Sequence, residues 1–226
     1  MNIRQKFDLE TKRFFDTDEV RLGPWTSESM IHDAKHLSFV LSRYKFVAKI
    51  LWGRKGVLEI GCGDAFGAPI VAQAVDMLYA IDWEERFIKE NTERLSFMNN
   101  ITFVHHDINA APIYIQEKMI NAIYNIDFIE HIDPLKEDIV MEHMIASYEK
   151  KEDAMMIIGT PNITASQYAS PQSMALHINL KSYDTLKALL NKYFYNVLMF
   201  GMNDEVVHTG YAPMCHYLWG IGIGLR

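Results

Sequence analysis

The feature of the sequence that most limits its fold is a regular alternation, between residues 56 and 160, of short apolar runs with segments of helical period. The runs that predict strands are 56–60, 77–82, 101–107, 120–127 and 154–160. The segments that predict helices are 66–74, 83–95 and 134–149, with a short element of mixed polarity near 112–118. Strands that alternate with helices pair in parallel through right-handed crossovers. We therefore expect an α/β fold with a Rossmann-like, mostly parallel sheet and helices on both faces.

The last third of the chain breaks this alternation. Residues 182–191 predict a helix with Ser182 as its N-cap, and strand-like runs follow at 193–201 and 214–223. The linker between these two runs is too short for a crossover helix, so the runs should pair antiparallel. The sheet is then expected to have seven strands and a C-terminal antiparallel hairpin at one edge.

A glycine-rich turn, GCGDAFG at residues 61–67, follows the first predicted strand. Gly61 and Gly63 permit backbone conformations that residues with a Cβ avoid, and they let a ligand approach the main chain. A dinucleotide fingerprint requires G-x-G-x-x-G, whereas here the third glycine comes one place late. Asp64 also puts a negative charge where a pyrophosphate would bind. The turn therefore favours a ligand without phosphate.

The stretch VLEIGCGDAFG, residues 57–67, resembles the first motif of the class I S-adenosylmethionine (SAM)-dependent methyltransferases. It departs from the pattern at Ala65, where many members have glycine. The resemblance implies that Gly61, Cys62 and Gly63 lie against the methionine portion and the ribose of SAM.

Two acidic residues end the next predicted strands. Asp82 lies about 20 residues beyond the turn, at a place from which a carboxylate can accept hydrogen bonds from both ribose hydroxyls. The resemblance gives Asp82 this role and places Trp83 beside the adenine. It assigns Asp107, at the end of the third strand, to the adenine amino group and Ile108 to the ring face.

The phrase NIDFIEHIDP, residues 125–134, resembles the corresponding motif of the branch that includes the ubiquinone-biosynthesis O-methyltransferases, and GTPN at 159–162 resembles a later loop of that branch. This resemblance adds Asn125 to the cofactor contacts. It implies transfer of a methyl group from SAM to an oxygen, or as a second choice a nitrogen, of a small-molecule or sugar-like acceptor. Two alternatives stay open: a non-catalytic SAM-binding regulatory or partner subunit, and a nicotinamide-dependent oxidoreductase.

Methyl transfer to a hydroxyl requires a group that takes the acceptor's proton. His131 follows the fourth strand, where the methyl is expected to point, and histidine titrates near neutral pH, so His131 is the predicted base. Asp127 is the second catalytic candidate, as a substrate contact or as the group that orients the base. His177 and His208 lie on loops expected to cover the pocket, as substrate contacts or surface residues.

No metal site is predicted from the sequence. A metal-assisted mechanism needs clustered oxygen ligands, and the spacing of Asp127, Asp133 and Asn162 does not establish such a cluster. The two cysteines, Cys62 and Cys215, are too few for a disulfide framework or a zinc cluster.

Charge and hydropathy restrict the partners. The net charge is −7 and no Lys/Arg cluster stands out, so a nucleic-acid partner is disfavoured. Neither a signal peptide nor an apolar run of roughly 20 residues is present in this sequence, so we expect no membrane span and a cytoplasmic location. The oligomeric state is not legible.

The length fits a single methyltransferase domain, residues 1–226. Residues 56–160 are expected to form the cofactor-binding core, and 161–226 the substrate-side loops with the C-terminal helix and hairpin. A helix is expected at 36–51. Residues 1–35 should be a lid or strap, read as irregular around Gly23-Pro24.

Overall fold

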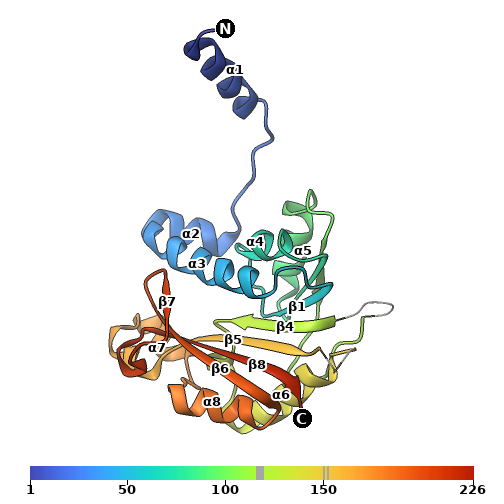
Figure 1. The fold of residues 1–226 in the computed structure, drawn as a ribbon, viewed down its shortest axis with the longest axis vertical. Coiled ribbons are helices and arrows are strands. Elements are labelled where there is room, and N and C mark those ends of the chain that lie inside the picture. The colour runs from blue at the N-terminus through green and yellow to red at the C-terminus, as the bar shows by residue number, and fades with distance from the viewer. Residues whose placement is uncertain (116–119, 150, 152) are drawn as a thin grey trace.

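The computed structural model of the protein describes residues 1–115, 120–149, 151 and 153–226. Its centre is one sheet of eight strands in the order β3-β2-β1-β4-β5-β8-β6-β7, and Figure 1 labels β1 and the strands from β4 to β8. The strands are β1 (Gly56–Ile60), β2 (Met77–Asp82), β3 (Ile101–His105), β4 (Ile120–Ile126), β5 (Met155–Pro161), β6 (Phe194–Asn203), β7 (Val206–His208) and β8 (Tyr217–Leu225). The five strands from β3 to β5 pair in parallel, which confirms the predicted Rossmann-like sheet. Part of the short element expected at 112–118 lies outside the described residues.

The C-terminal strands confirm the antiparallel hairpin and add one strand to the predicted seven. β8 lies between β5 and β6 and is antiparallel to both. The extra strand, β7, pairs with β6 at the sheet edge and occupies part of the segment that the sequence analysis treated as a linker. Only Asp204 and Glu205 separate β6 from β7, and Asp204 has a φ of +49°, a left-handed conformation that suits a two-residue hairpin loop.

Helices cover both faces of the sheet. The helices are α1 (Ile3–Phe15), α2 (Pro24–His32), α3 (Ala34–Ile50), α4 (Ala68–Ala72), α5 (Glu85–Arg94), α6 (Glu137–Ala146), α7 (Pro171–Leu176) and α8 (Tyr183–Asn191). In β1, Val57 packs with α3 and α4, whereas Leu58 packs with α6 and α8. This alternation follows from the two-residue period of a strand and gives the sheet one apolar core on each face. Ile88 of α5 packs with Ala80 of β2 in a smaller cluster, and Phe103 packs against both this cluster and that of α3 and α4.

The N-terminal segment contains two helices, and the second, α2, occupies part of the stretch around Gly23-Pro24 that was predicted to be irregular. Asn2 and Gln5 form a capping box at the start of α1, a local signal that the sequence analysis missed. Gly23 is the N-cap of α2 and Pro24 its first residue, a position that proline favours. Helix α1 stands away from the rest of the fold (Figure 1), and none of its residues is buried.

Deletion of residues 1–16 is expected to change the free energy of unfolding by less than about 0.5 kcal/mol, because no buried side chain is lost. A matched deletion of residues 1–26 also removes Thr26, whose two hydrogen bonds to Asp64 are buried. That deletion should lower the free energy of unfolding by roughly 2 kcal/mol or more. Urea denaturation of both truncated forms checks this, and equal losses would contradict it.

Candidate active site

A cavity of about 550 Å³ lies beyond the carboxyl ends of β1, β2 and β4, where open α/β sheets bind their ligands. This volume lies within the range of small-molecule sites. The sequence-predicted site residues that line this first cavity are Gly61, Cys62, Gly63, Asp82, Trp83, Asp127 and His131. The structure therefore brings seven of the ten predicted positions to one cavity.

The glycine turn forms the floor of the first cavity and depends on left-handed backbone conformations. The φ angles are +74° at Gly61, +51° at Gly63 and +53° at Ala65. A Cβ at Gly63 would lie 2.6 Å from the ring of Trp25, so the position requires glycine for both conformation and space. Ala65 adopts the same left-handed conformation despite its Cβ. The turn therefore forms although Ala65 stands where many members with this motif have glycine.

Side chains from β2 and α5 hold the turn in place. Asp82 accepts hydrogen bonds from the backbone N–H of Gly63 (2.9 Å) and of Glu84 (2.8 Å), one on each oxygen. Asn91, which is fully buried, donates to the carbonyl of Gly63 (2.7 Å). Each carboxylate oxygen keeps a further lone pair, so Asp82 can also accept from the hydroxyls of a bound ribose.

Asp64 anchors helix α2 over the turn. Its Oδ2 atom accepts from the backbone N–H (2.7 Å) and the hydroxyl (2.8 Å) of Thr26, in the first turn of that helix. A carboxylate at a helix N-terminus is favoured by the exposed N–H groups and by the helix dipole. Arg94 donates to the backbone carbonyl of Asp64 from the other side. Trp25 is thereby held against the turn, at the wall of the first cavity.

Glu59 lies beneath the turn with 1% of its surface exposed. Its Oε1 atom accepts a hydrogen bond from the hydroxyl of Tyr44 on α3 (2.9 Å). Burial raises the pKa of Glu59 to about 7, opposed by the hydroxyls of Tyr44 and of its β4 neighbour Tyr124, while the charge of Asp82 adds to the rise. The role assigned to Glu59 by this geometry is structural, since it joins β1 to α3.

The raised pKa of Glu59 makes stability depend on pH. The stabilisation from its protonated form is complete below its unfolded pKa of about 4.5 and is lost as the pH rises through 7. Glu59→Gln keeps the acceptor for Tyr44 but carries no charge. Between pH 5 and 8, the unfolding free energy of the wild type should fall by about 2 to 3 kcal/mol relative to that of the variant. Urea titrations at several pH values measure this, and parallel pH profiles would contradict it.

Of the three residues predicted to hold the adenine, Trp83 lines the first cavity, whereas Asp107 and Ile108 do not. Asp107 and Ile108 line a small hollow of about 10 Å³ next to it, together with Trp83. The Asp107 carboxylate is engaged locally, because its Oδ1 atom accepts from the backbone N–H and the side-chain amide of Asn109 (2.9 Å each).

Asn125 is a predicted cofactor contact that the structure places in the interior and away from the first cavity. Its side chain is fully buried in β4, with its amide near the sulfur of Met144. It is not among the described residues that line the first cavity, whereas its neighbour Ile126 is. The physical reason is the alternation of side chains along a strand, which turns adjacent residues to opposite faces.

A second cavity of about 920 Å³ adjoins the first and shares Ser29, His36 and Asp127 with it. Its other lining residues come from α2 and α3 with Asp33 between them, the segment after β4, the region from Pro161 to Leu180, and His216 before β8. Most of those side chains are polar or ionisable. The two cavities together offer adjoining space for a cofactor and an acceptor.

Asp127 stands where the two cavities meet. It follows β4 with a φ of +53°, an uncommon conformation for a residue with a Cβ and one that tends to occur at functional sites. Its Oδ2 atom accepts from Arg43 of α3, and the Arg43 guanidinium lies 4.1 Å from the ring centroid of Tyr217. The Oδ1 atom of Asp127 is buried without a hydrogen-bond partner among the described residues.

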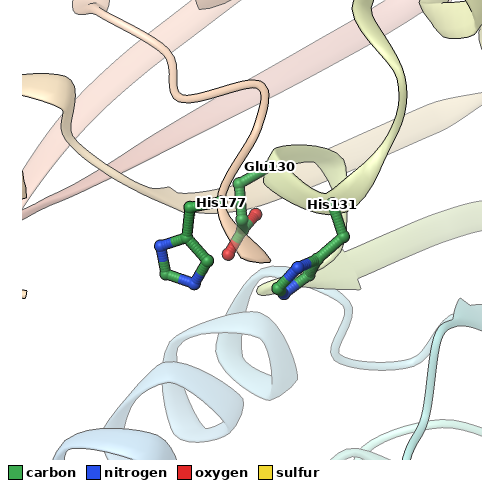
Figure 2. A group of neighbouring side chains, drawn as sticks. All are labelled: Glu130, His131 and His177. Carbon is green, nitrogen blue, oxygen red and sulfur yellow. The ribbon is translucent and has the colours of Figure 1, made fainter. Parts of the chain in front are cut away.

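His131 gathers with Glu130 and His177 at the same junction. Nitrogen and oxygen atoms of these three side chains lie within 4.8 Å of one another, and Figure 2 shows the Glu130 carboxyl between the two imidazole rings. The ring centroids of His131 and His177 are 5.0 Å apart. His131 lines the first cavity and His177 the second, so the ring pair bridges the boundary between them.

Burial shifts the protonation of this cluster. It raises the pKa of Glu130 to about 8, with the charge of Asp127 adding to the rise. It lowers the pKa of His177, helped by the neighbouring His131. At neutral pH the cluster in the free protein therefore favours a neutral Glu130 and a neutral His177.

Of the other candidates named from the sequence, Asn162 lines the second cavity, whereas His208 and Asp133 are not among the residues that line either cavity. His208, in β7, bonds with the side chain of Asn203 (2.9 Å). Asp133 caps the short 3₁₀ turn Pro134–Lys136. The amide of Asn162 donates to the carbonyls of Ala212 and Cys215 (2.9 Å each). Asp133 and Asn162 are thus engaged with backbone groups.

The sequence analysis missed several residues that shape the site. These are Thr26, Arg43, Asn91, Arg94 and Glu130. A signal was available for Asn91 and Arg94, which lie three residues apart on one side of α5 and are polar. Glu130 directly precedes His131 in the phrase 125–134, but the sequence analysis gave it no role. Thr26 and Arg43 meet the site only through contacts between distant segments.

Comparisons with known proteins agree with the fold. Residues 57–149 match the family model of a methyltransferase domain. The fold is similar to that of the DhpI-SAM-HEP complex, with a TM-score of 0.61 at 11% identity, covering 88% of this chain and 90% of that one. It is also similar to the N-methyltransferase NodS from Bradyrhizobium japonicum WM9 in complex with S-adenosyl-L-homocysteine (SAH), with a TM-score of 0.56 at 13% identity and coverage of 84% and 86%. The methyltransferase domain of bacterial CtHen1-C gives a TM-score of 0.63 at 16% identity, with coverage of 83% and 98%. No curated protein sequence matches the chain.

The fold and the matched domain define the class of protein. Residues 57–149 match a methyltransferase domain, and the predicted enzyme class, a SAM-dependent methyltransferase, and SAM as the cofactor are confirmed. The resemblance to the ubiquinone-biosynthesis branch is not confirmed by these matches. In the described part of the chain, every helix is too short or too polar to span a bilayer.

Proposed function

We propose that the protein transfers the methyl group of SAM to an oxygen of a small-molecule or sugar-like acceptor. The observation that carries this proposal is the junction of the two cavities. SAM in the first cavity and an acceptor in the second would meet beside Asp127, His131 and His177. Alignment of the acceptor with the methyl group supplies most of what such a displacement needs.

The reaction would run in one displacement. The acceptor oxygen forms a bond to the methyl carbon, the bond from that carbon to sulfur breaks, and SAH leaves. The hydroxyl proton must be removed, and His131 is the group that acts on it in this proposal. Asp127, which is held by Arg43, would contact the acceptor or fix its orientation.

The chemistry of the second cavity supports a polar acceptor of modest size. Its lining includes His32, Asp33, Ser166 and Ser170, which offer both donors and acceptors of hydrogen bonds. The net charge of −7 favours such an acceptor over RNA, although a structurally similar protein is described as a small RNA methyltransferase. The resemblance of residues 125–134 to the O-methyltransferase branch supports oxygen over nitrogen.

The test is incubation with SAM labelled on its methyl group and a panel of acceptors. The panel contains a catechol, a monophenol, a monosaccharide, a primary amine and a short RNA duplex. Label on a hydroxyl of one of the first three supports the proposal. Label only on the amine or on RNA would overturn it, and tight SAH binding in calorimetry with no transfer to any of them would favour a regulatory subunit.

A further inference from the structure

We propose that Glu130, His131 and His177 form a binding site for a divalent transition-metal cation at the junction of the two cavities. The set lies in the described part of the chain and brings one buried carboxylate together with two imidazoles. The role given below to the cation rests on the proposed methyl transfer, whereas the site itself does not. Figure 2 shows the three side chains converging from two separate segments.

The distances suit a cation after a small contraction. One ligand atom from each residue lies within 4.8 Å of the other two. With metal–ligand bonds of about 2.1 Å, atoms that share a cation lie roughly 3 to 4 Å apart. His131 is exposed and His177 is half-buried, so their side chains have room for this closure, whereas the buried Glu130 is fixed.

Glu130 supplies an independent reason to expect a ligand. Its side chain is completely buried, its Oε2 atom accepts from Thr160 (3.0 Å), and its Oε1 atom has no hydrogen-bond partner among the described residues. The nearby guanidinium of Arg43 is bonded to Asp127 instead. An unpaired buried carboxyl oxygen is costly, and a bound cation is one of the few partners that removes this cost.

The hydrogen bond of His131 prepares it as a ligand. Its Nδ1 atom lies 3.1 Å from the carbonyl oxygen of Leu176. A carbonyl only accepts, so Nδ1 carries the proton and Nε2 keeps the lone pair that a metal requires. Metal-binding histidines are oriented by this kind of bond to a backbone carbonyl. Leu176 precedes His177 in sequence, so the same bond also fixes the segment that carries the other imidazole.

Two imidazoles and one carboxylate are a donor set for transition metals such as Mn²⁺, Fe²⁺, Co²⁺ or Zn²⁺ rather than for Mg²⁺ or Ca²⁺. Three protein ligands leave positions open for the acceptor. A cation held there would act as a Lewis acid that lowers the pKa of the acceptor hydroxyl, so that its proton could pass to water while the oxygen bonds to the methyl carbon and the carbon–sulfur bond breaks. With the cation bound, His131 would hold the metal instead of taking the proton itself, which would revise the role of base that the proposed function gives it.

The experiment titrates the full-length, chelator-treated protein with Co²⁺ and Mn²⁺ by calorimetry, without SAM or acceptor, and records the visible spectrum of the Co²⁺ form. We expect one bound cation per chain. We also expect visible absorption bands of Co²⁺ that change when a coordinating side chain is replaced. His177→Ala and Glu130→Gln should each weaken binding at least tenfold. His208→Ala is the matched control, because this histidine bonds to Asn203 and is not among the residues that line the two cavities, and it should bind as the wild type does.

Absence of stoichiometric binding would overturn the proposal, as would binding that His177→Ala leaves intact. Loss in His208→Ala alone would place the cation elsewhere and would also overturn it. Circular dichroism checks folding, and His177→Ala decides the test if the buried Glu130→Gln does not fold. Binding without methyl transfer would leave the site standing and remove the proposed function. Methyl transfer that survives chelation, in a protein that binds no cation, would overturn the cation site and leave the proposed function standing.

Discussion

Replacement of His131 by alanine is expected to slow methyl transfer by roughly 100-fold or more, while the dissociation constant for SAH changes by less than about twofold. His131 lies at the junction of the two cavities and is exposed, so its removal should affect the reacting groups more than the fold. The rate with the acceptor identified from the labelled panel and the affinity for SAH by calorimetry are the two measurements.

The matched control for this variant is His208→Ala, which should retain the wild-type rate. Normal turnover by His131→Ala would mean that another group of the protein, or none, removes the proton of the acceptor hydroxyl. If the His131→Ala variant loses affinity for SAH to the same degree as it loses methyl-transfer rate, His131 is instead part of the cofactor site. Both a base and a metal ligand at this position predict the rate loss, and the cation titration above separates these two roles.

Elements set by local pattern could be predicted from the sequence, and elements set by distant contacts could not. The five parallel strands follow from apolar runs whose length and spacing require burial on both faces. Strand β7 was missed because three residues, Val206–His208, carry little pattern of their own and depend on pairing with β6. Helix α2 was missed because the bond that fixes its first turn joins Thr26 to Asp64, 38 residues away.

The same distinction applies to the site. The glycine turn and Asp82 were found because a strand followed by a turn fixes where its last residues lie, and both line the first cavity. Asn125 was placed with the cofactor contacts on resemblance alone, and a shift of one residue along a strand is enough to turn a side chain into the core. His177 joins His131 across 46 positions of sequence through the bond to Leu176, a relation that spacing alone does not reveal.

Replacement of Asp82 by alanine is expected to weaken SAH binding by about 1.5 to 3 kcal/mol, which is roughly 10- to 150-fold in the dissociation constant. The geometry gives two reasons. The variant loses the carboxylate that faces the ribose position, and it frees the N–H of Gly63, so that the glycine turn is less well ordered for the cofactor. Asp82→Asn keeps one acceptor oxygen and should lose less affinity than the alanine variant.

The matched control is Asp138→Ala, which removes an exposed carboxylate that pairs with Lys192 and is not among the residues that line the two cavities, so this variant should bind SAH normally. Calorimetry with SAH measures all three variants, and thermal unfolding shows whether the turn alone is affected. An unchanged dissociation constant in a folded Asp82→Ala protein would mean that the ribose lies elsewhere. The reason is that no other carboxylate among the described residues both lines the first cavity and bonds to the glycine at the centre of the turn.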